Sequence, residues 1–272
     1  MIRAGRLNWL EIVGGTIALS LVVVALFAPV IAPHDPTRAV AQTFGDPGPP
    51  SLAFPCGTDQ LGRDVLSRLI YGARVSLIVG LSAMAVAMTV GVAAGLCAGF
   101  FGGWTEMVLM RLTDVMLTLP GLLLAMAFVA ILRPSLLTIL LVISLVSWTG
   151  VARVVRAETL SMTNRDFVLA ARALGASAGR LMIRHVMPNI MPTVVVMAAL
   201  STSGTLLLDA GLSFLGLGVP PPTPSWGRMV EESQIYFRTA PWLAFFPGLA
   251  ILYAVLGFNL LGYGFLRRRN PQ

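Results

Sequence analysis

Six long apolar runs constrain this chain more than any other feature of its sequence. Each run has about the 20 apolar residues that a helix needs to cross the hydrocarbon core of a bilayer. Lipid cannot satisfy free backbone groups, and the strict alternation of a barrel strand is absent, so each run is expected to be a transmembrane helix. The six runs cover residues 10–32, 77–99, 107–132, 136–155, 192–215 and 243–266.

The composition indicates an all-α integral membrane protein. Of the 272 residues, 56% are hydrophobic and 11% are charged, whereas about a quarter of a soluble domain is charged. All 19 basic side chains are arginines, and the net charge of +7 suits anionic lipid headgroups and acidic partner surfaces. No interleaved aromatic and basic pattern favours nucleic acid. The first run is too long for a signal peptide and is expected to stay as an anchor.

The sequence offers no framework for a disulfide, a metal site or a bound cofactor. Cys56 lies in a polar loop and Cys97 in an apolar run, so the two are not expected to meet. The lone histidines, His34 and His185, are poor candidates for metal ligands. The Gly-x-x-x-x-Gly-Lys-Ser/Thr loop that holds nucleotide phosphates does not occur.

The placement of arginine predicts the orientation. With six spans and a cytoplasmic N-terminus, twelve arginines face inward and seven outward, as the positive-inside rule favours, although four of the seven lie in the first external loop. Both termini are therefore expected inside. The inward arginines are at positions 3, 6, 111, 153, 156, 165, 172, 180, 184, 267, 268 and 269.

Residues 165–189 form a polar, arginine-rich segment that lies inside in this orientation. Asn164 can cap a short helix there, and Gly175 can end it in the left-handed conformation. Small residues in its apolar stripe would let another surface approach closely. The stripe consists of Phe167, Ala170, Ala171 and Leu174, at helical spacing.

A second helix is expected in the same segment. Ser177 can cap it, Leu181 and His185 share one face, and Pro188 is expected to end it before the fifth run. Periodicity leaves two interpretations open. The helix, turn and helix either rest on lipid headgroups or form a docking surface for a soluble partner.

The segment resembles the EAA loop of ABC importer permeases, which forms the coupling helix that sits in a cleft of the ATPase subunit. The shared pattern is Ala170-Ala171, three residues, Gly175, nine residues, then His185-Val-Met-Pro188. Leu169 departs from it, because the family has Glu there, and His185 stands where the general pattern has Ile. The resemblance implies a coupling role for Arg165, Phe167, Leu169, Ala170, Ala171, Arg172, Leu174, Gly175, His185 and Pro188.

The change to Leu169 has a physical consequence. A Glu at this position could pair with Arg165 or Arg172 at helical spacing, and Leu cannot. The two arginines are instead expected to reach Asp166 or acidic groups on the ATPase.

Longer motifs in the correct order extend the resemblance over nearly the whole chain. They narrow it to the dipeptide, oligopeptide and nickel importer permeases, and within these to the C-type. Tyr263 departs from the family, which usually has Asp there, and arginines at 267–269 follow where that branch often has acids. The motifs are GTDQLGRDVLSRLIYGARVSL at 57–77, FGGW at 101–104, LSFLGLG at 212–218, PPTPSWG at 221–227 and APWLAFFPGLAI at 240–251.

The resemblance implies a type I importer permease fold with six transmembrane helices and a cytoplasmic coupling helix. It implies three parts: an N-terminal end with the first helix (1–32), an external loop with an interfacial helix (33–76), and a five-helix core (77–272) with the coupling loop at 160–190. The implied partners are a second, homologous permease, two ATPases that hold ATP and Mg, and an extracytoplasmic solute-binding protein, in the inner membrane of a prokaryote. This non-catalytic subunit would pass di- or oligopeptides, or alternatively nickel, a metal chelate or glutathione.

Three polar residues in the spans admit more than one role. Asp209 either lines the transport path or makes a structural hydrogen bond near the outer surface. Asp114 is expected to pair with Arg111, three residues earlier. Asn259 is expected to hydrogen-bond between helices rather than to touch substrate.

Gly91, Gly95 and Gly99 form a flat stripe that lets helices pack closely. Packing inside the subunit is the preferred use over an interface between two permeases.

The resemblance implies an outward docking surface at 57–72 and 219–238. Thr58 or Asp59 can cap a short amphipathic helix through Val65, Leu69 and Ile70 that lies along the outer membrane surface.

Two other classes fit less well. A secondary transporter would share the spans and a buried Asp209, but it should show an internal repeat, and none is visible. A membrane enzyme would need a nucleophile or metal set, and no His-Glu-x-x-His motif occurs.

Overall fold

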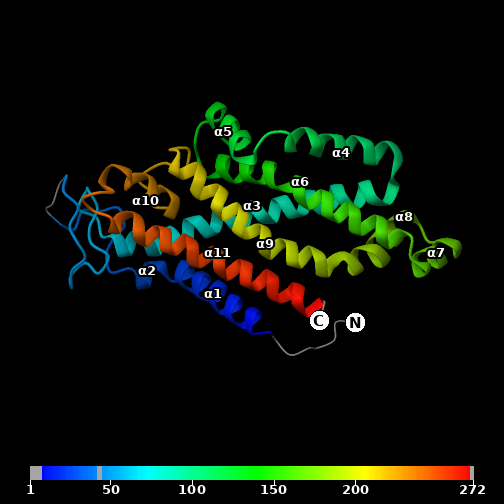
Figure 1. Cartoon of the computed structure of the whole chain (residues 1–272), viewed down its shortest axis with the longest axis horizontal. Coiled ribbons are helices and arrows are strands. Elements are labelled where there is room, and N and C mark those ends of the chain that lie inside the picture. Colours follow the sequence, from blue (N-terminus) through cyan, green and yellow to red (C-terminus); the bar gives the residue numbers. More distant parts are fainter. Residues whose placement is uncertain (1–7, 42–44, 270–272) are drawn as a thin grey trace.

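The computed structural model describes residues 8–41 and 45–269, which are mostly helical, with two isolated β-bridges and no strand in these ranges. Five helices are long and apolar enough to span a membrane, and there are six spans if one sharply bent pair counts as a span. The long helices run side by side along the long axis (Figure 1). They are α1 Trp9–Leu26, α3 Val65–Phe101, the bent pair α4 Gly103–Leu117 and α5 Gly121–Ile131, α6 Leu136–Thr163, α9 Met187–Phe214 and α11 Trp242–Arg269.

The multi-pass, all-α architecture expected from the sequence is confirmed. The apolar runs coincide with the five long helices and the bent pair, but four of these six differ in detail from the expectation. Of the arginines used to predict the orientation, Arg3 and Arg6 lie outside the described residues.

The first span is broken near its end. α1 stops at Leu26, and a short helix α2, Ala28–Ile31, follows after Phe27. Pro29 causes the break, because its ring has no N–H and clashes with the preceding turn.

The second span is one continuous helix, so the expected interfacial helix is wrong. Asp64 is the N-cap of α3, and its carboxylate accepts hydrogen bonds from the backbone N–H groups of Leu66 at 3.3 Å and Ser67 at 3.1 Å. The 37 residues of α3 reach about 55 Å, well beyond the ~30 Å hydrocarbon core. The residues assigned to an interfacial helix are the first turns of this span.

The third span is bent rather than straight. α4 and α5 meet at 87° across Thr118 to Pro120. Pro120 is the N-cap of α5 and cannot continue α4 through the bend. At its other end, α4 is joined to α3 by Gly102 and Gly103, whose φ angles of 65° and 53° favour glycine.

The second helix of the polar segment continues into the fifth span, so the expectation that Pro188 ends it is wrong. A short helix α8 (Ala178–Arg180), a π-helical segment (Leu181–Val186) and α9 follow without a break. A proline ring clashes with the carbonyl four residues earlier, and the wider π-helical turns before Pro188 make room for it. Residues 178–214 therefore form one continuous helical segment.

The core is centred on α3 and α6, which pack together along the glycine stripe. A β-carbon on any of the three glycines would overlap α6, so the stripe serves packing inside the subunit, as predicted. The β-carbon would lie 2.6 Å from Val151 Cβ at Gly91, 2.5 Å from the Ala152 carbonyl oxygen at Gly95, and 2.7 Å from the Arg156 carbonyl oxygen at Gly99.

The two ends of the bundle carry different structures. At one end lie the loop that follows α2 and a short helix α10, Trp226–Glu232 (Figure 1). At the opposite end lie α8 and a short helix α7, Asp166–Ala173, beyond the ends of α1 and α11 (Figure 1).

Candidate functional site

The helix α7 ends where the sequence predicts but begins differently. Gly175 has φ 82°, and the N–H groups of Gly175 and Ala176 donate to the carbonyls of Arg172 at 3.0 Å and Ala171 at 3.1 Å. This pair of bonds is a Schellman motif, which satisfies the last carbonyls of the helix. Asn164 is not the N-cap, because Arg165 occupies that position and the Asn164 amide donates back to the Leu160 carbonyl.

One residue anchors α7 to the bundle while most of its apolar stripe faces away. Val168 is 0% exposed and belongs to the core cluster that contains Leu181 and Val186. Leu174 is 89% exposed, Phe167 and Ala170 are also exposed, and only Ala171 is partly covered. The helix therefore presents uncovered apolar surface at the tip of the bundle.

The arginines of α7 make one contact that the sequence did not predict. The Arg172 guanidinium carbon lies 5.8 Å from the centroid of the Phe100 ring, within the range of a cation–π contact. Within residues 8–41 and 45–269, no ion pair joins Asp166 to Arg165 or Arg172. The Asp166 alternative is therefore wrong for the described residues, and the other alternative, acidic groups on the ATPase, stays a prediction.

The segment after α7 positions the remaining coupling residues. Ser177 is the N-cap of α8, as predicted, but its side chain makes no capping hydrogen bond. His185 is partly buried in the π-helical segment, and its carbonyl accepts a hydrogen bond from the Asn189 amide at 2.6 Å.

The sequence of residues 175–179, Gly-Ala-Ser-Ala-Gly, matches the Gly-x-Ser-x-Gly pattern of a hydrolase nucleophile elbow. In a hydrolase that elbow follows a strand, whereas here Ser177 follows a helix, so the match does not indicate a catalytic serine.

Asp209 is buried inside the subunit, and Asn259 bonds within its own helix. Asp209 is 2% exposed and enclosed by Ser76, Trp226 and Ala254, and its Oδ1 has no hydrogen-bond partner among the described residues. Its role in a transport path between two permeases stays a prediction. Asn259 donates to the Val255 carbonyl at 3.0 Å within its own helix, so the interhelical bond expected for it is wrong.

Asp114 pairs across helices rather than with Arg111. Its Oδ1 lies 2.5 Å from Nη2 of Arg153 on α6. A second pair joins Glu106 on α4 to Arg156 on α6, with Arg156 Nε donating at 2.7 Å. The predicted pair with Arg111 is wrong because the next helix offers a nearer guanidinium. These two pairs cross an open groove of about 550 Å³ between α4 and α6.

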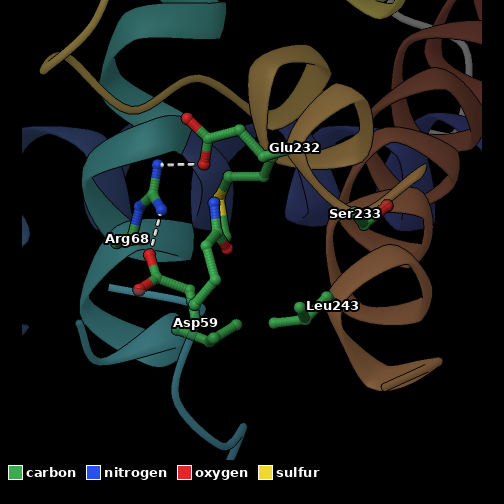
Figure 2. Close-up of a pocket in the computed structure, with 8 residues that line it drawn as sticks. Asp59, Arg68, Glu232, Ser233 and Leu243 are labelled. Carbon is green, nitrogen blue, oxygen red and sulfur yellow. Dashed lines mark hydrogen bonds and ion pairs between the residues drawn. The ribbon is translucent and has the colours of Figure 1, made fainter. Parts of the chain in front are cut away.

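A buried ionic network at the opposite end was not predicted. Figure 2 shows the Arg68 guanidinium between the carboxylates of Asp59 and Glu232. Arg63 also contacts Asp59 at 2.6 Å and Glu232 at 3.4 Å. The network fixes the loop before α3 against α10. Glu232 is far in sequence from the other three residues, so no local pattern could reveal that it joins them.

Both cysteines are free. Cys56 is buried in the loop before α3, and burial raises the pKa of its thiol, with a further rise from the Asp64 carboxylate. The thiol is therefore neutral and a poor nucleophile.

A bundle of five or six apolar helices long enough to span a bilayer is the architecture of a multi-pass membrane protein. The chain belongs to the family of binding-protein-dependent transport system inner membrane components, whose model matches residues 91–271. The model of the N-terminal transmembrane domain of oligopeptide transport permease C matches residues 3–50.

Curated relatives match almost the full length. A di/tripeptide transport system permease of Pseudomonas aeruginosa is 45% identical over 95% of this chain and 87% of its own length. A dipeptide transport system permease of Alkalihalophilus pseudofirmus is 38% identical over 97% and 86%. A glutathione transport system permease of Escherichia coli is 38% identical over 99% and 89%.

Proposed function

We propose that this chain is the C-type permease subunit of an ATP-driven importer of di- and oligopeptides. The similarity to a di/tripeptide permease over nearly the whole chain carries the proposal. The chain would form the translocation path together with a second, homologous permease, and a solute-binding protein would deliver the peptide from outside. Glutathione is the second candidate substrate, because a glutathione permease is also similar over nearly the whole chain.

The energy would come from two partner ATPases that hold ATP and Mg, since this chain has no phosphate-binding loop and acts as a non-catalytic subunit. The uncovered apolar face of α7 supports docking there. Val168 packs α7 against the bundle, the Schellman motif fixes the end of the helix, and the contact of Arg172 with Phe100 links it to the end of α3. A displacement of α7 by the ATPase would therefore be transmitted to the transmembrane helices.

The same proposal places both termini and α7 in the cytoplasm. Leu174→Cys is then expected to escape a membrane-impermeant maleimide in spheroplasts, because only the outer surface meets the reagent. Leu52→Cys, which is fully exposed at the other end, is expected to react. Both substitutions are made in a chain with Cys56 and Cys97 replaced by serine. Labelling of Leu174→Cys and not of Leu52→Cys would show that α7 faces outward, which is the opposite of the proposed orientation.

The coupling role predicts a large effect of one surface substitution. Leu174→Glu puts a charge on the exposed apolar face of α7 at no cost to the fold, because the side chain contacts little else. Burying that unpaired charge in an ATPase cleft is unfavourable. We expect at least a tenfold loss of ATPase retained on purification and of binding-protein-stimulated ATP hydrolysis.

Leu52→Glu is the matched control, since it makes the same change on a fully exposed leucine far from α7. It is expected to retain the ATPase. Equal retention of the ATPase by both variants would remove α7 as the coupling element, whereas uptake of peptide by the unmodified complex would still support the proposed function.

A further inference from the structure

The groove between α4 and α6 has the size and the open face of a ligand site. Its volume of about 550 Å³ falls in the range of small-molecule pockets, roughly 300–1,000 Å³. α4 stands away from α6 here, and the two ion pairs bridge the gap. The groove is lined by Gly103, Glu106, Met107, Met110, Arg111, Asp114, Arg153 and Arg156.

The groove contains acidic and basic side chains, and one of its guanidinium groups belongs to no ion pair among the described residues. Arg153 and Asp114 are both about half-exposed, and Arg156 and Glu106 are partly exposed. Pairs this accessible contribute little to stability, so exchanging their partners costs little. In the described part of the chain, Arg111 belongs to no ion pair, which leaves the groove with a net charge of +1.

The charges are spaced for a short zwitterion. Glu106 and Asp114 lie eight residues apart on α4, about 12 Å along the helix axis. Because the Arg153 guanidinium contacts Asp114, a positive group and the Glu106 carboxylate stand about that far apart. An extended tripeptide covers about 10 Å between its charged ends. Met107 and Met110 add flexible, polarisable walls that tolerate side chains of different shape.

We propose that this groove is a transient binding station on the translocation path, where the arginines hold the carboxylate of a short peptide and Glu106 or Asp114 holds its ammonium group. The inference rests on the proposed function and deepens it, because it places the substrate on this chain. The two interhelical pairs open as the peptide enters and close again when it leaves.

A photo-crosslinking amino acid at Met107 tests the station directly. Met107 lines the groove, whereas Trp104 on the same helix is 79% exposed and does not. The complete importer, with its binding protein and ATPases, is placed in vesicles of phosphatidylethanolamine and phosphatidylglycerol and supplied with a radiolabelled tripeptide. We expect peptide to be captured at position 107 during ATP turnover at least fivefold more than at 104.

The other outcomes are equally decisive. Capture of only the second permease at 107 would make the groove a subunit interface, and capture of only lipid would make it a headgroup site. Either result, with peptide uptake intact, overturns the station and leaves the proposed function standing. Absence of uptake by the unmodified importer would overturn both.

Charge removal supplies an independent measurement. Asp114→Asn with Arg153→Gln removes both charges of one pair while keeping polar side chains, and is expected to lower peptide uptake about tenfold while binding-protein-stimulated ATP hydrolysis stays within twofold. The control neutralises another exposed pair, Asp35→Asn with Arg38→Gln, and is expected to leave uptake unchanged. Equal uptake by the two variants would contradict the station.

Discussion

Gly95→Ala is expected to destabilise the protein by about 3 kcal/mol, the upper end of the usual cost of overpacking. The added methyl group would lie 2.5 Å from the carbonyl oxygen of Ala152 and 2.7 Å from Val155 Cβ. The nearest neighbour is a backbone atom, so no rotamer change can relieve the overlap and α3 must move away from α6. Unfolding of the purified protein by a denaturing detergent, followed by circular dichroism, measures the loss.

Gly150→Ala is the matched control, because Gly150 lies in α6 and has open space where its β-carbon would be. There the same substitution is expected to be neutral or stabilising by up to about 1 kcal/mol, since alanine restricts the unfolded chain and favours a helix. If both variants unfold alike, the close contact along the glycine stripe is not present in the protein.

The spans were predictable because lipid leaves a segment of about 20 apolar residues few alternatives. The departures have local causes that hydropathy does not register. Pro29 and Pro120 break helices without interrupting the apolar runs. Pro188 has the opposite effect, since the π-helical turns before it let the helix continue through a residue expected to stop it.

The contacts of the candidate sites were less predictable from the sequence than the spans. The stripe of α7 and its end at Gly175 follow from local spacing, which the sequence displays. Val168 holds the helix down although it lies outside that stripe, because the bundle contacts α7 from the other side. Asp114 pairs with Arg153 on another helix and not with the nearby Arg111, and Arg172 contacts Phe100, which is far from it in sequence. Helix-to-helix partners depend on packing that periodicity within one helix cannot supply.

Arg68→Met is expected to destabilise the protein by about 3–5 kcal/mol, the usual cost of breaking a buried ion pair. Arg68 is 2% exposed and contacts both Asp59 and Glu232. Methionine fills a similar volume but leaves Asp59 with Arg63 alone and Glu232 with Arg63 and Arg228, so the buried cluster loses one positive charge. The loop before α3 should separate from α10, and limited proteolysis between residues 45 and 64 should become at least tenfold faster.

Removing a second charge should restore much of that loss. In Arg68→Met with Glu232→Gln, Asp59 keeps its 2.6 Å contact with Arg63 and no carboxylate of the network remains without a partner. Arg38→Met is the control, because Arg38 lies in an exposed pair with Asp35 and should change neither stability nor proteolysis. A double variant that is no more stable than Arg68→Met would show that Arg68 acts through its packing. Recovery would show that the buried charges must balance, which also explains why arginines on the outer side need not conflict with the proposed orientation.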